Sequence, residues 1–247
     1  MALDVVDLRE FYISSLGRVV RRILRARLVQ IWPDVAGESL LALGYATPLL
    51  RPWLAKATSI CAIMPDQQGV AYWPREGPNV ACIADLTHLP LPDEAVSRVV
   101  MLHALENMTD PEAYLREVWR VLKSGGRALI VVPNRRNFWA HHDGTPFGAG
   151  QPYSASQLRA LLREQGFYIE RSWHALYWPP GHSRISLVLS GLVERLGVLL
   201  PSVFGGVHIV EVGKQIYSPT LSGAKSGRRR MVLPLFPKPS SPVSTRQ

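Results

Sequence analysis

The chain has 247 residues, of which 47% are hydrophobic, and this excludes a largely disordered protein and suits one large domain. The formal net charge is +9, but seven basic residues and no acidic one lie between Lys214 and Gln247, so the rest of the chain is close to neutral. The charge therefore does not indicate a basic nucleic-acid-binding body. Cys61 and Cys82 lie in apolar stretches without a C-x-x-C spacing, which predicts buried free thiols.

The N-terminal stretch MALDVVDLRE is acidic and has no apolar core, so it does not resemble a signal peptide. The longest apolar run, residues 185–200, is interrupted by Glu194 and Arg195 and is too short to cross a bilayer. We therefore expect a cytoplasmic protein without a transmembrane segment. Residues 218–247 are rich in Pro, Ser, Gly and Arg and are predicted to form a flexible basic tail, which could bind an anionic partner such as RNA or a membrane.

A helix is predicted over residues 4–29, because apolar residues recur there at spacings of three and four. The same stretch carries the arginines Arg18, Arg21, Arg22, Arg25 and Arg27. They are interpreted first as a solvated basic face, and second as part of a lid over a site or a contact for an anionic partner. Residues 1–34 are assigned to an N-terminal helical cap.

The rest of the chain alternates between apolar strands and helices. Strands are predicted at 39–44, 58–64, 79–85, within 95–105, and at 127–133, 167–176 and 208–217, and helices at 51–57, 111–122, 154–166 and 185–200. This alternation favours a mostly parallel sheet with helices on both faces. Such sheets bind ligands outside the carboxyl ends of their strands, and the segment LGYATP, residues 43–48, lies at that position after the first strand.

Residues 85–134 carry the most specific pattern, which runs from an Asp through L-P-L-P, an apolar strand and the helix segment E-V-W-R-V-L to K-S-G-G and another strand. Residues 152–172 continue it with a helix, Gly-Phe and a strand. In order and spacing these blocks resemble the class I S-adenosylmethionine (SAM)-dependent methyltransferases of type 11. The resemblance covers residues 35–217 and implies an α/β, Rossmann-like seven-stranded sheet of order 3-2-1-4-5-7-6 with the last strand antiparallel.

The resemblance also implies SAM as the cofactor and assigns residues to its site. The family's G-x-G-x-G loop corresponds to Gly44, Tyr45 and Ala46, followed by Thr47-Pro48. Ala46 is compatible with such a loop if its φ is negative. Met64 and Pro65 end the second strand, where the family has an acid that binds the ribose, and Asp66 lies beyond them.

Two further stretches complete the implied cofactor site. Asp85 and Leu86 follow the third strand, where family members bind the adenine amino group; the alternative for Asp85 is a turn cap. His103 follows the fourth strand and corresponds to residues that line the methionine end of the cofactor, with a core histidine as the alternative. Residues near the methyl group are assigned by fold position to the substrate: Phe11, Tyr12, Asn134, Arg135, Phe147 and Tyr153.

No metal site is predicted, because His141, His142 and Asp143 are adjacent in a loop without a recognised ligand spacing. The first functional hypothesis is a SAM-dependent methyltransferase that acts on an unknown small-molecule or macromolecular acceptor. The alternative is a catalytically inactive, methyltransferase-like binding or regulatory protein. It rests on departures from the family pattern at the first loop and the second strand end: Ala42, Ala46, Pro48 and Met64.

Overall fold

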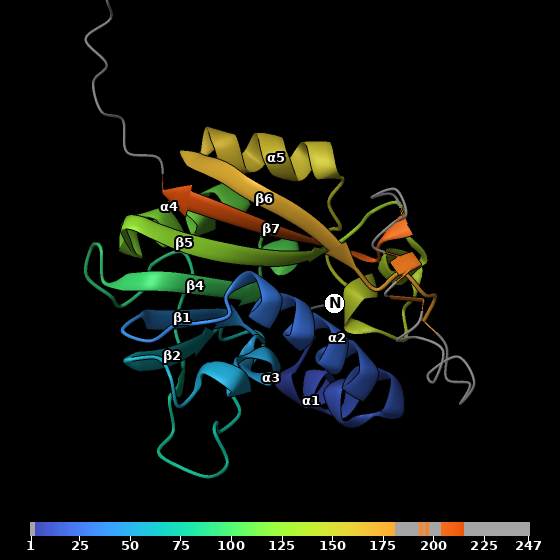
Figure 1. Ribbon diagram of the computed structural model, residues 1–247, viewed down its shortest axis with the longest axis horizontal. Coiled ribbons are helices and arrows are strands. Elements are labelled where there is room, and N and C mark those ends of the chain that lie inside the picture. The colour runs from blue at the N-terminus through green and yellow to red at the C-terminus, as the bar shows by residue number, and fades with distance from the viewer. Residues whose placement is uncertain (1–2, 181–192, 195, 198–203, 215–247) are drawn as a thin grey trace, which may run out of the picture. The chain divides into compact units, whose positions relative to one another are not determined.

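The computed structural model describes residues 3–180, 193–194, 196–197 and 204–214 (Figure 1). The described residues belong to one compact unit, Met1–Gln215. The predicted basic tail lies outside the described residues, as does most of the helix expected at 185–200.

The unit is built on a seven-stranded sheet whose order is β3-β2-β1-β4-β5-β7-β6 (Figure 1). Its strands are β1 Ser39–Gly44, β2 Ser59–Met64, β3 Ala81–Ile83, β4 Val96–Leu102, β5 Leu122–Pro133, β6 Phe167–Ala175 and β7 Val207–Lys214. Within this described sheet, β7 runs antiparallel to its neighbours β5 and β6, and the other pairs are parallel. The expected strand order and the antiparallel last strand are confirmed.

Helices cover both faces of the sheet, as the alternation of strands and helices predicted. They are α1 Val5–Ile13, α2 Ser15–Ile31, α3 Thr47–Leu50, α4 Pro111–Val121 and α5 Ala155–Glu164, with single turns at η1 Arg51–Trp53, η2 Leu105–Asn107, η3 Phe138–His141 and η4 Pro146–Gly148. Alternate residues of β1 enter two separate cores. Leu40 packs in the core that contains α2, and Leu41 packs in the core that contains α4 and α5.

The N-terminal segment forms two helices, whereas a single helix was predicted. Ser14 has an extended backbone (φ −58°, ψ 164°), and its side chain caps α2 by accepting a hydrogen bond from the Gly17 N–H at 3.0 Å. A side chain at position 17 would lie 1.8 Å from the carbonyl oxygen of Phe11. The serine cap and this close approach turn the chain between α1 and α2, and apolar spacing alone does not reveal such a turn.

The segment after β1 also differs from the prediction. A helix was expected at 51–57, but α3 begins at Thr47 and the chain continues from Arg51 as the short 3-10 turn η1. Pro52 lies in that turn and has no N–H to extend an α-helix. The cap residue of α3 is Ala46, without a side-chain cap. By contrast, Ser154 and Gln157 form a capping box at the start of α5.

Candidate functional site

The carboxyl ends of β1, β2, β3 and β4 lie along one edge of the sheet, and the predicted cofactor residues follow directly from these strands. Gly44 ends β1 in the left-handed region, with φ +71°. A β-carbon there would lie 2.5 Å from the Leu102 carbonyl oxygen and 2.8 Å from the Ala104 side chain at the end of β4. Only glycine meets both conditions, so this residue joins the tips of the two central strands.

A cavity of about 190 Å³ opens at this edge of the sheet. Three segments supply most of its wall: residues 65–68 after β2, 85–87 after β3, and 107–110 around the start of α4. Leu3, and His103 directly after β4, complete it. Of the predicted cofactor residues, Pro65, Asp85, Leu86 and His103 therefore line one cavity. Its volume is below the roughly 300 Å³ at which small-molecule sites begin.

Asp85 presents a charged carboxylate at the mouth of this cavity. Its oxygens accept hydrogen bonds from the Thr87 backbone N–H at 2.8 Å, the Thr87 hydroxyl at 2.7 Å and His88 Nδ1 at 3.0 Å. The hydrogen bond from the Thr87 hydroxyl contributes most to lowering the pKa of Asp85 to about 2. The side chain is still 61% exposed, and a carboxylate has lone pairs for further donors. The residue thus caps its own turn and stays available to a ligand.

The end of β2 departs from the expected ribose site. Met64 is fully buried in the core on the α2 face and does not line the cavity. Asp66, two residues further on, is exposed and lines it, while its Oδ1 accepts the Gln67 N–H at 2.8 Å. In the first loop, Ala46 is buried with φ −88°, so a methyl group is compatible with the backbone there.

His103 in the cavity wall is bonded to Tyr12, which lies outside the residues that line the cavity. Tyr12 Oη and His103 Nε2 are 2.9 Å apart, and both side chains are almost fully buried. The Tyr12 ring lies 5.7 Å from the Tyr45 ring, and the His103 ring lies 4.8 Å from the Phe147 ring. Burial raises the pKa of Tyr12 well above its usual value, and Tyr45 and Glu106 raise it further. Aromatic side chains thus fill the space that the resemblance assigns to the methionine end.

His103 has two properties typical of functional positions. Its backbone is left-handed, with φ +52°, which is uncommon outside glycine and occurs often at active sites. Its second ring nitrogen, Nδ1, lies 3.4 Å from Glu106 Oε1, and both side chains are buried. Among the described residues, the Glu106 oxygens have no hydrogen-bond partner. Glu106 was absent from the predicted site, although a carboxylate in the apolar segment HALENM is a signal that could have revealed it.

Helix α1 lies over this edge of the sheet. The Val5 N–H at its start donates to the Gln68 carbonyl oxygen at 2.7 Å, and Gln68 Nε2 donates to the His103 carbonyl oxygen at 3.3 Å. Tyr12 near its end reaches His103. The N-terminal helices are therefore bonded to the candidate site at both ends of α1, which is the arrangement of a lid.

The predicted substrate residues fall into two groups. Phe11 packs edge-on against Tyr12 and Phe147, with ring centroids 5.2 and 6.3 Å apart, so these aromatic side chains gather around His103. Asn134 is buried and donates from Nδ2 to the Gly205 carbonyl oxygen at 2.8 Å. Arg135 and Tyr153 are joined to each other by a backbone hydrogen bond of 3.0 Å. Asn134 therefore holds the segment that precedes β7, and Arg135 holds the segment that precedes α5.

Other predictions concern cysteines, metals and membranes. Cys82 is exposed and Cys61 is half-buried, so the prediction of two buried thiols was wrong for Cys82, which lies on the edge strand β3. Burial raises the pKa of Cys61 to about 11. Within the described ranges there is no cluster of three or more His, Cys, Asp or Glu side chains that could hold a metal. No helix in the described part of the chain is long and apolar enough to cross a membrane.

Comparison with known proteins gives matches to part of this chain. Residues 41–130 match the family described as methyltransferase domain. A Mycobacterium tuberculosis protein described as a probable S-adenosylmethionine-dependent methyltransferase is 32% identical over 127 residues, which are 50% of this chain and 45% of that protein. A demethylmenaquinone methyltransferase of Chlamydia trachomatis is 35% identical over 117 residues, 41% of this chain and 51% of that one. The chain spans about half the length of these curated relatives.

Solved structures share the fold at low sequence identity. A SAM-dependent methyltransferase from Thermotoga maritima superposes with a TM-score of 0.57 at 17% identity, covering 85% of this chain and 96% of that one. A cyclase superposes with a TM-score of 0.55 at 20% identity, covering 79% and 82%. At these identities the similarity shows the fold alone.

Proposed function

Because the chain belongs to the class I methyltransferases by its domain match and its fold, we propose that it transfers a methyl group from SAM to an acceptor molecule. The observation that carries this proposal is the cavity at the carboxyl ends of β2, β3 and β4, where residues from three separate strand ends converge. In an open α/β sheet this is the position at which ligands bind.

The residues present fit the adenosine half of SAM. The charged Asp85 carboxylate is suited to accept from the adenine amino group, and the apolar Leu86 lies beside it in the same cavity wall. Asp66 is the exposed carboxylate within the cavity that is suited to the ribose hydroxyls. Asp66 would thus bind the ribose in place of Met64, which is buried and has no polar group for it. Charge-assisted hydrogen bonds of this kind give both affinity and orientation.

The methionine half needs a rearrangement of the lid. Tyr12, Tyr45 and Phe147 fill the space between the first loop and His103. We infer that α1 moves when the cofactor enters, because Tyr12 and Gln68 connect that helix to His103. SAM when bound supplies an electrophilic methyl group on a positively charged sulfur. The chain then contributes a dry, closed pocket, with the buried His103 beside it and the Glu106 carboxylate 3.4 Å from His103 Nδ1.

A calorimetric titration of the full chain with SAM and with S-adenosylhomocysteine tests this proposal. We expect Asp85→Ala to weaken both affinities about 10- to 150-fold, because one charge-assisted hydrogen bond contributes roughly 1.5–3 kcal/mol. Asp34→Ala is the matched control, since Asp34 also caps its own turn, by accepting the Ala36 N–H at 3.1 Å, and does not line the cavity.

The inactive alternative makes the opposite prediction for the same experiment. It is favoured by the filled methionine end, where Tyr12 and His103 are bonded to each other. A folded sample that takes up neither compound at millimolar concentration would support a binding or regulatory protein and contradict methyl transfer. Equal affinities for wild type and Asp85→Ala would contradict the adenosine position.

A further inference from the structure

A second hollow lies beside the first loop, on the far side of Tyr12 from the adenosine cavity. It measures about 380 Å³, within the range of small-molecule sites. We call it the arginine pocket and define it by Arg9, Arg21, Arg51 and Arg75, which line it. Tyr12 and Tyr45 form part of its wall.

The arginines come from four separate segments and converge on one aromatic wall. Arg9 belongs to α1, Arg21 to α2, Arg51 to η1, and Arg75 to the loop before β3. Burial raises the pKa of the Tyr45 hydroxyl, and the positive charges of Arg9, Arg75 and Arg21 act against that rise. These three guanidinium groups therefore line the same hollow as the tyrosine of the first loop and act on its hydroxyl electrostatically.

Little negative charge balances this cluster. Among the described residues, Arg9, Arg21 and Arg75 have no carboxylate within ion-pair distance, and Arg51 alone is paired, with Glu76 at 3.5 Å and with both side chains 65% exposed. An exposed pair of this kind contributes little. The pKa of the neighbouring Arg25 is lowered, first by burial and then by the positive charges of Arg21 and Arg51. Positive charge is therefore in excess around Arg25 as well. Glu76 also lines the pocket, so one carboxylate faces four arginines and an excess of positive charge remains.

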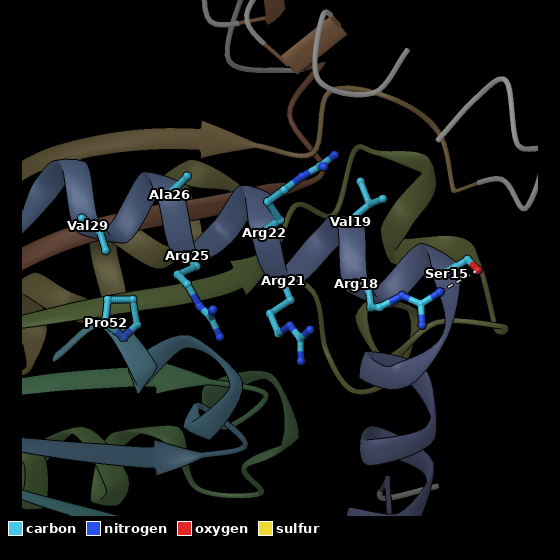
Figure 2. A pocket seen from close by; sticks show the side chains of 9 residues that line it. All are labelled: Ser15, Arg18, Val19, Arg21, Arg22, Arg25, Ala26, Val29 and Pro52. Atoms are coloured by element: carbon cyan, nitrogen blue, oxygen red, sulfur yellow. Dashed lines mark hydrogen bonds between the residues drawn. The ribbon is translucent and has the colours of Figure 1, made fainter. Parts of the chain in front are cut away.

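The arginines of α2 point in two directions, some toward the segment after the first loop and others toward the solvated face of the helix (Figure 2). Figure 2 shows Arg21 and Arg25 pointing from α2 to the side of Pro52, whereas Arg22 points to the opposite side. Arg25 Nη2 donates to the Pro48 carbonyl oxygen at 2.6 Å, which attaches α2 to the segment after the first loop. The arginines of this helix therefore serve two purposes, and Arg21 is the one that enters the arginine pocket.

The position of the pocket fits the acceptor side of a methyl transfer. Tyr12 lines the arginine pocket, His103 lines the adenosine cavity, and these two residues are bonded at 2.9 Å. The methyl group would be transferred between the two hollows, where this pair lies. Resting on the proposed function, we propose that the arginine pocket binds a phosphate group of a small methyl acceptor. Guanidinium groups bind phosphate in a bidentate manner, and a dianion matches several unpaired arginines.

Inorganic pyrophosphate is the probe for this proposal, titrated calorimetrically into the full chain at fixed low ionic strength without SAM. We expect binding that Arg21→Gln and Arg75→Gln each weaken about tenfold, since each removes a charge-assisted hydrogen bond. Arg22→Gln removes the same charge from the same helix outside the pocket, and its effect should be less than threefold. Sodium acetate at the same ionic strength should bind more weakly than pyrophosphate.

Three results would overturn the phosphate site: no binding at millimolar pyrophosphate, equal weakening by all three substitutions, or acetate binding as tightly. Loss with Arg22→Gln but not Arg75→Gln would place the anion along the outer groove of α2 and would also overturn it. SAM binding without pyrophosphate binding rejects the phosphate site and leaves the methyltransferase proposal intact. Site-specific pyrophosphate binding without SAM binding supports the phosphate site and rejects the methyltransferase proposal.

Discussion

Gly44 shows how one residue constrains the first loop. It has φ +71°, and a β-carbon would lie 2.5 Å from the Leu102 carbonyl oxygen, so both the backbone conformation and the space exclude a side chain. The family's other loop positions tolerate substitution more easily, because Ala46 is buried with a negative φ. The retained glycine is thus the one that joins β1 to β4.

We predict that Gly44→Ala lowers the free energy of unfolding by about 2–4 kcal/mol, through left-handed strain and a steric clash together. Gly37→Ala is the matched control, because Gly37 has φ +78° and a methyl group added there would meet no atom within 4 Å. It should cost only the strain, about 1–2 kcal/mol. Urea denaturation measures both values, and equal losses would contradict a close approach at Gly44.

The residues of the candidate site also show where sequence was insufficient. Asp85 and Leu86 were predicted from one continuous block, and they do lie in the cavity wall. The Tyr12–His103 hydrogen bond joins residues 91 positions apart, and no periodicity or spacing indicates such a contact. Glu106 was missed because it lies just beyond the predicted strand region, residues 95–105, and no motif assigned it a role.

At the scale of elements, sequence predicted the buried strands better than the segments that turn. The limits of β1 agree with the prediction, because an apolar run between polar ends leaves little freedom. The turn at Ser14 depends on a local serine cap and on the close approach of Gly17 to the Phe11 carbonyl, and α3 begins at Thr47 without a side-chain cap. Such features set where a helix begins and ends, which apolar spacing alone does not show.

The pairing of β6 with β7 predicts a pH dependence of stability. His208 on β7 is 4% exposed, and its ring lies 5.1 Å from His174 on β6. Burial, followed by the charge of His174, lowers the pKa of His208 to about 4 from an unfolded value of 6.5. Between these values the unfolded chain binds a proton that the folded chain does not. Stability is therefore complete above pH 6.5 and falls as the pH decreases towards 4.

We expect the free energy of unfolding to decrease by about 3 kcal/mol at most across that window, from the conversion of roughly 1.4 kcal/mol per pKa unit. His208→Phe should flatten the dependence, whereas His141→Asn, at an exposed position, should leave it unchanged. Urea denaturation at pH values from 4 to 7 measures the slope. A slope that survives His208→Phe would assign the effect to other groups.

At the scale of the whole described unit, the fold alone does not identify the reaction. The same sheet occurs in a SAM-dependent methyltransferase and in a cyclase, with similar TM-scores of 0.57 and 0.55. Strand order was predictable because many sequences share its pattern. In this chain the two N-terminal helices bring Tyr12 to His103 and place arginines beside the first loop.

The proposed movement of α1 leads to a prediction about the whole described unit. If Tyr12 must leave its position before SAM enters, part of the binding free energy is spent on that movement, and the apparent affinity is reduced. We expect Tyr12→Ala to bind SAM at least about tenfold more tightly than wild type. The same variant should lose about 3–5 kcal/mol of unfolding free energy, because a buried aromatic ring is removed.

Two further variants separate opening from general destabilisation. Phe167→Ala removes a fully buried ring at the start of β6, outside both hollows, and should destabilise the chain without a gain in SAM affinity. Tyr12→Phe keeps the ring and loses only the hydrogen bond to His103, so its SAM affinity should stay close to wild type. Calorimetry and thermal unfolding on the same samples give both quantities. If Phe167→Ala binds SAM more tightly than wild type, or if Tyr12→Ala shows no gain in SAM affinity, the ring of Tyr12 does not obstruct the cofactor.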